Sequence, residues 1–202
     1  ATLSLAMALG ACGSYAGAAT SLAARSATEA NAEHREGTVE NTADATVISA
    51  NGSDITVTGD GAVAADGTVT IQKAGTYVLR GNFAEGQLVA DAEEGVEIKL
   101  VFDGFTISNS TNAPLVFESG ARVTIVLQDG TENAVSDLRN SAEDNKAAIY
   151  AKSDLTISGN GALAVQGNAE DAIHSEANVT VEGGTLTLKA GDDGIHADET
   201  LT

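Results

Sequence analysis

The sequence predicts an all-β fold, a parallel β-helix (solenoid), from an internal repeat, an alternating apolar pattern and a low aromatic content. Ile149, Ile173 and Ile195 occupy equivalent positions in three aligned segments, at offsets of 173 − 149 = 24 and 195 − 173 = 22 residues. Periods of this size are typical of solenoids, in which each copy buries its apolar face against the next. Within the copies apolar and polar residues alternate, as at Leu155 and Ile157, which is the two-residue period of strands. Because aromatic residues make up only 3% of the chain, the core is expected to be narrow and filled by aliphatic side chains.

Residues 1–12 have the features of a secretion signal that ends in a lipobox. The apolar run at residues 3–11 is too short to span a bilayer, and it leads directly into Cys12, which is the predicted lipidation site. The alternative is an ordinary signal peptide that is cleaved elsewhere. Both place the domain outside the cytoplasm, either lipid-anchored to the bacterial cell membrane or secreted. Residues 13–45 are rich in Ala, Ser and Thr without an alternating pattern, which predicts a flexible tether.

The predicted β-helix domain spans residues 46–202, with rungs of about 22–27 residues that share an alternating pattern. Alternating segments separated by Gly-rich turns occur at residues 55–57, 69–71, 77–79, 87–90, 96–102, 105–107, 114–117 and 123–127. Residues 133–146 interrupt this rhythm and predict a projecting loop, which is either a binding loop or a tolerated surface insertion. The chain ends at Thr202 within a predicted strand, so we expect a C-terminal truncation with further rungs in the natural protein.

Stacking of rungs about 4.8 Å apart turns equivalent residues into neighbours. The inward ladders are expected to be Ile149, Ile173 and Ile195, and Leu155, Val179 and Leu201. The outward columns are expected to be Tyr150, His174 and His196, and Thr156, Thr180 and Thr202. At the turns, Ala147, Asp171 and Asp193 are expected to share a column.

The chain is strongly acidic, with a formal net charge of −19. Such a surface repels nucleic acid and anionic membranes, so we expect neither as a partner beyond the lipid anchor. It suits a hard cation such as calcium, which takes oxygen ligands, although solubility alone also explains the charge. Stacked carboxylates of Asp171 and Asp193 would repel unless a cation bridges them or one pKa rises. Asp is also favoured in turns for local reasons. The predicted metal ligands are Asn168, Asp171, Asp192, Asp193 and Asp198.

Several of these segments resemble a known family. They are GTYVLRG from Gly75, GTEN from Gly130, AAIYAKSDLTI from Ala147, DAIH from Asp171 and DDGIHA from Asp192. Over residues 46–202 the chain is similar to the bacterial extracytoplasmic family of carbohydrate-binding domain-containing proteins. The resemblance implies a right-handed parallel β-helix with bound calcium, related in architecture to polysaccharide lyases, and a plant-cell-wall polysaccharide as partner. The first acidic turn departs from the family pattern, because it reads Glu170-Asp171-Ala172 where Asp-Asp-Gly is expected.

The function predicted on these grounds is a non-catalytic, calcium-associated polysaccharide-binding module of a surface-anchored lipoprotein, acting as a monomer. Tyr150, His174 and His196 are the predicted carbohydrate-binding residues, with an ordinary solvated strand ladder as the alternative. An acidic glycan such as pectate would bind through calcium. A calcium-dependent pectate-type lyase is the enzyme alternative; it needs a basic residue near the metal, and only Lys146 and Lys152 lie close in the repeat. A structural surface rod or adhesin is the third alternative.

Overall fold

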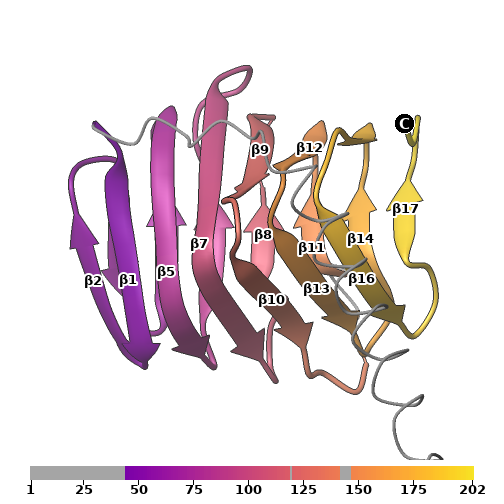
Figure 1. Ribbon diagram of the computed structural model, residues 1–202, viewed down its shortest axis with the longest axis horizontal. Coiled ribbons are helices and arrows are strands. Elements are labelled where there is room, and N and C mark those ends of the chain that lie inside the picture. Colours follow the sequence, from indigo (N-terminus) through magenta and orange to yellow (C-terminus); the bar gives the residue numbers. More distant parts are fainter. Residues whose placement is uncertain (1–43, 119, 142–146) are drawn as a thin grey trace, which may run out of the picture. The chain divides into compact units, whose positions relative to one another are not determined.

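The computed structural model describes residues 44–118, 120–141 and 147–202. These residues form an all-β structure of two sheets whose strands are mostly parallel (Figure 1). The predictions for Cys12, for residues 1–12 and for nearly all of the tether at residues 13–45 lie outside the described residues. Across the three described ranges, no helix has the length and apolar character needed to cross a membrane.

The two sheets divide the strands as follows. The ten-stranded sheet contains β1 (Thr46–Gly52), β2 (Asp54–Thr58), β5 (Gly75–Ala84), β7 (Glu97–Asn109), β9 (Arg122–Leu127), β10 (Glu132–Asp137), β12 (Leu155–Gly159), β13 (Ala162–Gly167), β15 (Val179–Val181) and β16 (Thr185–Ala190). The seven-stranded sheet contains β3 (Ala62–Ala65), β4 (Thr68–Ile71), β6 (Gln87–Ala90), β8 (Leu115–Phe117), β11 (Ala147–Ala151), β14 (Asp171–Ser175) and β17 (Ile195–Ala197).

Successive repeats contribute strands to three parallel ladders. The first ladder runs β4–β6–β8–β11–β14–β17. The other two share the parallel strands β1, β5 and β7 and separate at the long strand β7, because its first half pairs with β9 and its second half with β10. From there the ladders continue as β9–β12–β15 and β10–β13–β16. This arrangement is compatible with a β-helix or another solenoid; antiparallel pairs join β1 to β2 and β3 to β4.

The predicted pairing of both inward ladders is confirmed, but Leu201 at the end of the second ladder is 53% exposed. Ile173 pairs with Ile149 on one side and with Ile195 on the other, and the same ladder reaches back to Leu115 and Leu88. Except for the half-buried Ile195, all these side chains are fully buried. Full burial of one such side chain contributes about 1.5–3 kcal/mol, so the repeats stabilise one another through their common core. In the second ladder Val179 pairs with Leu155 and with Leu201 in the same way.

The loop predicted at residues 133–146 is wrong at its beginning, because Glu132–Asp137 forms β10. The Asn133 side chain ties this strand to both neighbours: its Oδ1 accepts the N–H of Phe105 at 2.9 Å, and its Nδ2 donates to the carbonyl of Ala162 at 3.0 Å. Val135 is fully buried and aligns with a β-branched residue on each neighbouring strand. The segment Glu132–Asp137 is therefore a strand of the sheet although most of its residues are polar. Residues 142–146 lie outside the described residues.

Gly159 ends β12 where the chain passes very close to β9. Its φ of +91° lies in the left-handed region, and a Cβ at this position would lie 2.2 Å from the carbonyl oxygen of Leu127. Gly130 is a matched control, because its φ is +72° but nothing lies within 4 Å of its Cβ position. The Gly130→Ala change is expected to destabilise the protein by about 1–2 kcal/mol from backbone strain alone. Because Gly159→Ala adds a steric overlap, we expect it to destabilise by about 1–3 kcal/mol more, measured by urea unfolding. Equal losses for the two variants would contradict the close approach.

Candidate functional site

The three ring residues predicted to share a column do so, although Tyr150 is buried and not outward as predicted. Tyr150 pairs with His174 across β11 and β14, and His174 pairs with His196 across β14 and β17. The two imidazoles are stacked, with ring centroids 4.6 Å apart and planes 18° apart. The Tyr150 and His174 rings are tilted, with centroids 5.5 Å apart. The two imidazoles therefore cover one another's faces, whereas the Tyr150 ring meets His174 at an angle.

Tyr150 is much less accessible than a sugar-stacking ring would be, with 9% of its surface exposed. It packs in a small cluster with Ala113, Val116 and Ala147. Its hydroxyl donates a hydrogen bond to a carboxylate oxygen of Glu176. Burial raises the pKa of the Tyr150 phenol, and the nearby negative charges raise it further. Because the Tyr150 ring is largely covered, it offers little surface on which a sugar could stack. The carbohydrate-binding role of this column stays a prediction.

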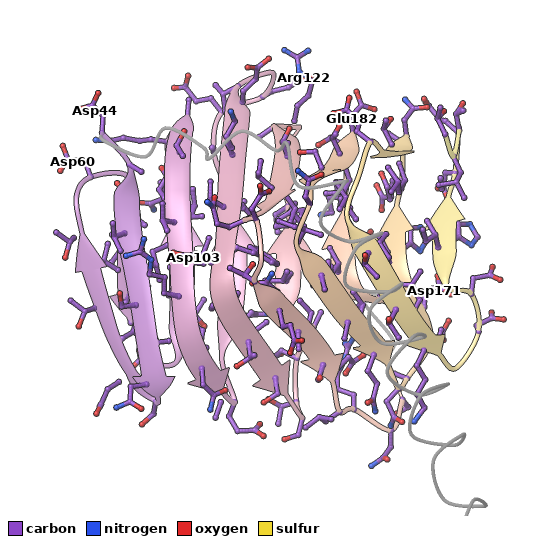
Figure 2. The ribbon with its side chains drawn as sticks, viewed as in Figure 1. Asp44, Asp60, Asp103, Arg122, Asp171 and Glu182 are labelled. Atoms are coloured by element: carbon purple, nitrogen blue, oxygen red, sulfur yellow. The ribbon has the colours of Figure 1, made fainter. Side chains whose placement is uncertain are left out.

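Carboxylates lie on both sides of the two imidazoles, and we call Asp171, His174, Asp193, His196 and Asp198 the histidine–aspartate cluster. Figure 2 labels Asp171, the first residue of β14. On one side, His174 Nδ1 lies 3.3 Å from Asp171 Oδ2, and His196 Nδ1 lies 3.4 Å from Asp193 Oδ2. On the other side, Asp198 Oδ1 lies 3.4 Å from His174 Nε2 and 3.3 Å from His196 Nε2. Asp171 is buried and also accepts the backbone N–H of Asp193 at 2.9 Å.

Three of the five predicted metal ligands, Asp171, Asp193 and Asp198, therefore meet in this cluster. The other two do not join it. Asn168 donates its side-chain N–H to the carbonyl of Arg139 at 2.7 Å, and the exposed Asp192 makes no side-chain hydrogen bond or ion pair within the described residues. The histidines, predicted as sugar contacts, are the groups that face the three carboxylates. A calcium role for these residues stays a prediction.

A second polar surface, which the sequence did not indicate as a site, is a groove of about 540 Å³ on the ten-stranded sheet. We call it the threonine groove, because the column Thr124, Thr156 and Thr180 runs across β9, β12 and β15 along it. Arg122 stands at one edge of the molecule, at the start of β9 (Figure 2). The full lining is Glu97, Arg122, Val123, Thr124, Asp154, Thr156, Asn178, Thr180, Thr200 and Thr202.

The groove combines free hydroxyls with fixed polar groups. Within the described ranges the hydroxyls of the three column threonines form no hydrogen bond. Asp154 Oδ1 accepts the side-chain N–H of Asn178 at 2.8 Å, which holds both groups in place at the groove wall. The groove could have been anticipated from the predicted alignment of Thr156 with Thr180, but no function was assigned to that column.

Of the two basic groups considered for a lyase, the structure describes only Lys152, and its ion-pair partner is not in the histidine–aspartate cluster. Lys152 forms an ion pair with Glu118, and this contact raises the pKa of the Lys152 ammonium. Lys146 lies outside the described residues. Among the described ion pairs, the partners of Asp171, Asp193 and Asp198 are the two histidines.

Known proteins resemble this chain in sequence and in fold. A curated relative from Acetivibrio thermocellus, described as a carbohydrate-binding domain-containing protein, is 36% identical over 137 residues. The match covers 65% of this chain and 48% of the relative, so this chain spans about half of the relative's length. A solved structure titled "Structure of the polysaccharide lyase-like protein from C. thermocellum, Gadolinium derivative" matches with a TM-score of 0.69 and 28% identity, over 78% of this chain and 79% of that one. The family model described as carbohydrate-binding domain-containing protein matches residues 65–202, more than half of the chain, which therefore belongs to this family.

Proposed function

We propose that the chain is a non-catalytic, calcium-associated polysaccharide-binding module of a surface-anchored bacterial lipoprotein. The observation that carries the binding function is the threonine groove, a polar channel with unpaired hydroxyls on a sheet face. Membership of a carbohydrate-binding family and the likeness to a polysaccharide lyase-like protein support a polysaccharide as the partner. The three parallel ladders support a right-handed parallel β-helix as the architecture.

The groove offers the groups that a sugar chain recognises. A polysaccharide carries hydroxyls that both donate and accept, and threonine hydroxyls do the same. Because neighbouring strands are about 4.8 Å apart, Thr124, Thr156 and Thr180 repeat along the groove at a regular interval that an extended polymer can follow. The Arg122 guanidinium at the groove edge supplies a charged donor for an acidic sugar.

The remaining parts of the proposal rest on the sequence and on local contacts. The lipobox-like residues before Cys12 support a lipid anchor and an extracytoplasmic location. The engagement of Lys152 by Glu118 supports binding without catalysis, because a general base must be free to approach the substrate. We propose that the module acts as a monomer.

For calcium, the turn at Gly191 supplies suitable oxygen donors. A Cβ placed on Gly191 would lie 3.1–3.4 Å from the carbonyl oxygens of Asn168, Ala169 and Glu170. Three carbonyls therefore lie close together next to Asp192. That of Glu170 already accepts the backbone N–H groups of Gly191 and Asp192, which leaves those of Asn168 and Ala169 as candidate ligands for calcium, an ion that takes six to eight oxygens. The printed title of the solved relative names a gadolinium derivative, and gadolinium is likewise a hard, oxygen-seeking cation. Calcium bound at this turn would supply positive charge for an acidic glycan.

The groove is tested by removing two of its hydroxyls. Each neutral hydrogen bond contributes about 0.5–1.5 kcal/mol, so the double change Thr156→Ala and Thr180→Ala is expected to weaken polysaccharide binding about 5- to 150-fold. The measurement is a binding isotherm of the purified full chain with polygalacturonate and, separately, with xylan. Each isotherm is recorded in calcium and in chelator.

The matched control is the double change Thr185→Ala and Thr187→Ala, which removes two exposed threonines from β16, away from the groove. This control is expected to bind as the unchanged chain does. A chelator is expected to weaken binding of polygalacturonate but not of xylan. Equal weakening by both double changes, or no binding of either polysaccharide, would refute the groove as the binding surface, and release of unsaturated sugar products would favour the lyase.

A further inference from the structure

The histidine–aspartate cluster contains more lone pairs than its protons can satisfy. His174 and His196 are parallel and stacked, with a carboxylate facing each Nδ1 and a single carboxylate oxygen of Asp198 facing both Nε2 atoms. Both ring nitrogens of His174 are buried and have no hydrogen-bond partner among the described residues. Burying a polar atom without a partner costs free energy, and a bound ligand at these nitrogens would remove that cost.

Counting the N–H protons of the two rings shows which atoms lack a hydrogen-bond donor. A neutral imidazole has one N–H donor and one bare lone pair. If the Nδ1–H groups face Asp171 and Asp193, the two Nε2 lone pairs face the acceptor-only carboxylate of Asp198. Three electron-rich atoms then point at one another. If both rings are instead doubly protonated, two positive charges are stacked with centroids 4.6 Å apart. A cation between the two Nε2 atoms and the Asp198 oxygen removes the conflict.

The separations fit a small tetrahedral metal ion. Bonds of about 2.0–2.2 Å in tetrahedral geometry place neighbouring ligand atoms about 3.3–3.5 Å apart. The Asp198 oxygen lies 3.4 Å from one Nε2 and 3.3 Å from the other, which is longer than a good hydrogen bond of about 2.7–3.2 Å. One ligand atom from each of His174, His196 and Asp198 lies within 4.8 Å of the others. The two stacked rings must turn out of their parallel arrangement for both Nε2 lone pairs to meet one ion.

We propose that His174 Nε2, His196 Nε2 and an Asp198 oxygen bind a divalent transition metal of the zinc class, with solvent in the fourth position. Asp171 and Asp193 act as positioning residues, since each places a carboxylate oxygen 3.3–3.4 Å from an Nδ1. A proton drawn to Nδ1 by that carboxylate leaves the Nε2 lone pair for the metal. Imidazole nitrogen suits zinc, copper and nickel, whereas calcium takes oxygen ligands. The site is therefore distinct in chemistry from the turn at Gly191 that we propose for calcium. His196 and Asp198 have side chains 43% and 49% exposed, which leaves a route for the ion.

The test is a titration of the metal-free full chain with Zn²⁺ alone, in competition with a chromogenic chelator. We expect one zinc ion per chain, and we expect His196→Ala and Asp198→Asn each to weaken zinc binding by at least about tenfold. Both side chains are largely exposed, so the variants are expected to fold, which circular dichroism checks. Zinc is also expected to raise the midpoint of thermal unfolding of the unchanged chain but not of these two variants.

Two further variants separate ligands from positioning residues and from general histidine content. Asp193→Asn is expected to weaken zinc binding about 10- to 100-fold while X-ray absorption still reports two imidazole ligands. His34→Ala removes the remaining histidine of the chain, which lies outside the described residues, and is expected to bind zinc as before. Zinc affinity unchanged in His196→Ala and Asp198→Asn, or lost in His34→Ala, would overturn the proposal. So would displacement of zinc by an equal concentration of calcium.

Discussion

Replacing Asp137 by alanine is expected to lower the free energy of unfolding by about 3–5 kcal/mol, because it removes one partner of a buried ion pair. Asp137 ends β10 and has no exposed surface. Its Oδ1 accepts the backbone N–H and the Nε–H of Arg139, both at 2.9 Å, and its Oδ2 accepts Nη2–H at 2.9 Å. The guanidinium is itself buried and also donates to the carbonyl of Ala147 at 3.3 Å. The pair therefore connects the end of β10 to the start of β11.

The measurement is equilibrium unfolding in urea, with Asp103→Ala as the matched control. Asp103 forms an ion pair with Arg80 at 2.7 Å, but these side chains are 29% and 52% exposed. Exposed pairs contribute about 0–1 kcal/mol, so the control should change the unfolding midpoint little. A loss below about 1 kcal/mol for Asp137→Ala would mean that the Asp137–Arg139 pair is not buried in solution.

The second large effect is expected for Phe102→Ala, at about 3–5 kcal/mol. Phe102 is fully buried in the middle of β7, the strand from which two ladders diverge. Its ring meets the Phe105 ring edge to face, with centroids 5.4 Å apart. In a chain with so few aromatic residues, the neighbouring aliphatic side chains are poorly placed to fill the space that the ring leaves.

Thermal and urea unfolding of Phe102→Ala are compared with those of Val63→Ala. Val63 is 56% exposed on β3, and a surface change of this kind is expected to stay within about 0.5 kcal/mol. A Phe102→Ala variant as stable as the control would contradict the position of this ring at the centre of the core.

The inward ladders could be predicted from the sequence because strand geometry fixes them. Side chains alternate with a period of two, so once Ile149, Ile173 and Ile195 are aligned, every residue between them is assigned a face. The structure confirms this register through the pairing of Ile173 with both neighbours. The repeats need not have equal lengths for this prediction, because differences in turn length do not change how the strands align with one another.

β10 could not be predicted because side-chain contacts between distant residues create it. Only Val135 is a large apolar residue in Glu132–Asp137, too few for an alternating pattern to stand out. The strand depends on Asn133, which bonds to residues 28 and 29 positions away, and on the buried Asp137–Arg139 pair. Buried polar residues of this type read as loop residues in a sequence.

In the candidate sites too, strand register could be predicted from the sequence, whereas contacts between distant residues could not. The column of Tyr150, His174 and His196 was predicted from register, and the acidic residues near it were named. The burial of Tyr150 was not, because Ala113 and Val116 cover it from an earlier repeat. The orientation of Asn168 toward Arg139 was equally hidden, since it depends on the strand that the sequence did not predict.

The most direct test of polysaccharide binding in the threonine groove is an NMR titration that follows threonine methyl groups while oligogalacturonate is added to the full chain. We predict shifts for Thr124, Thr156 and Thr180, which line the groove, and none for Thr185 and Thr187 on β16. Shifts confined to the rings of Tyr150, His174 and His196, with the groove threonines unchanged, would contradict it.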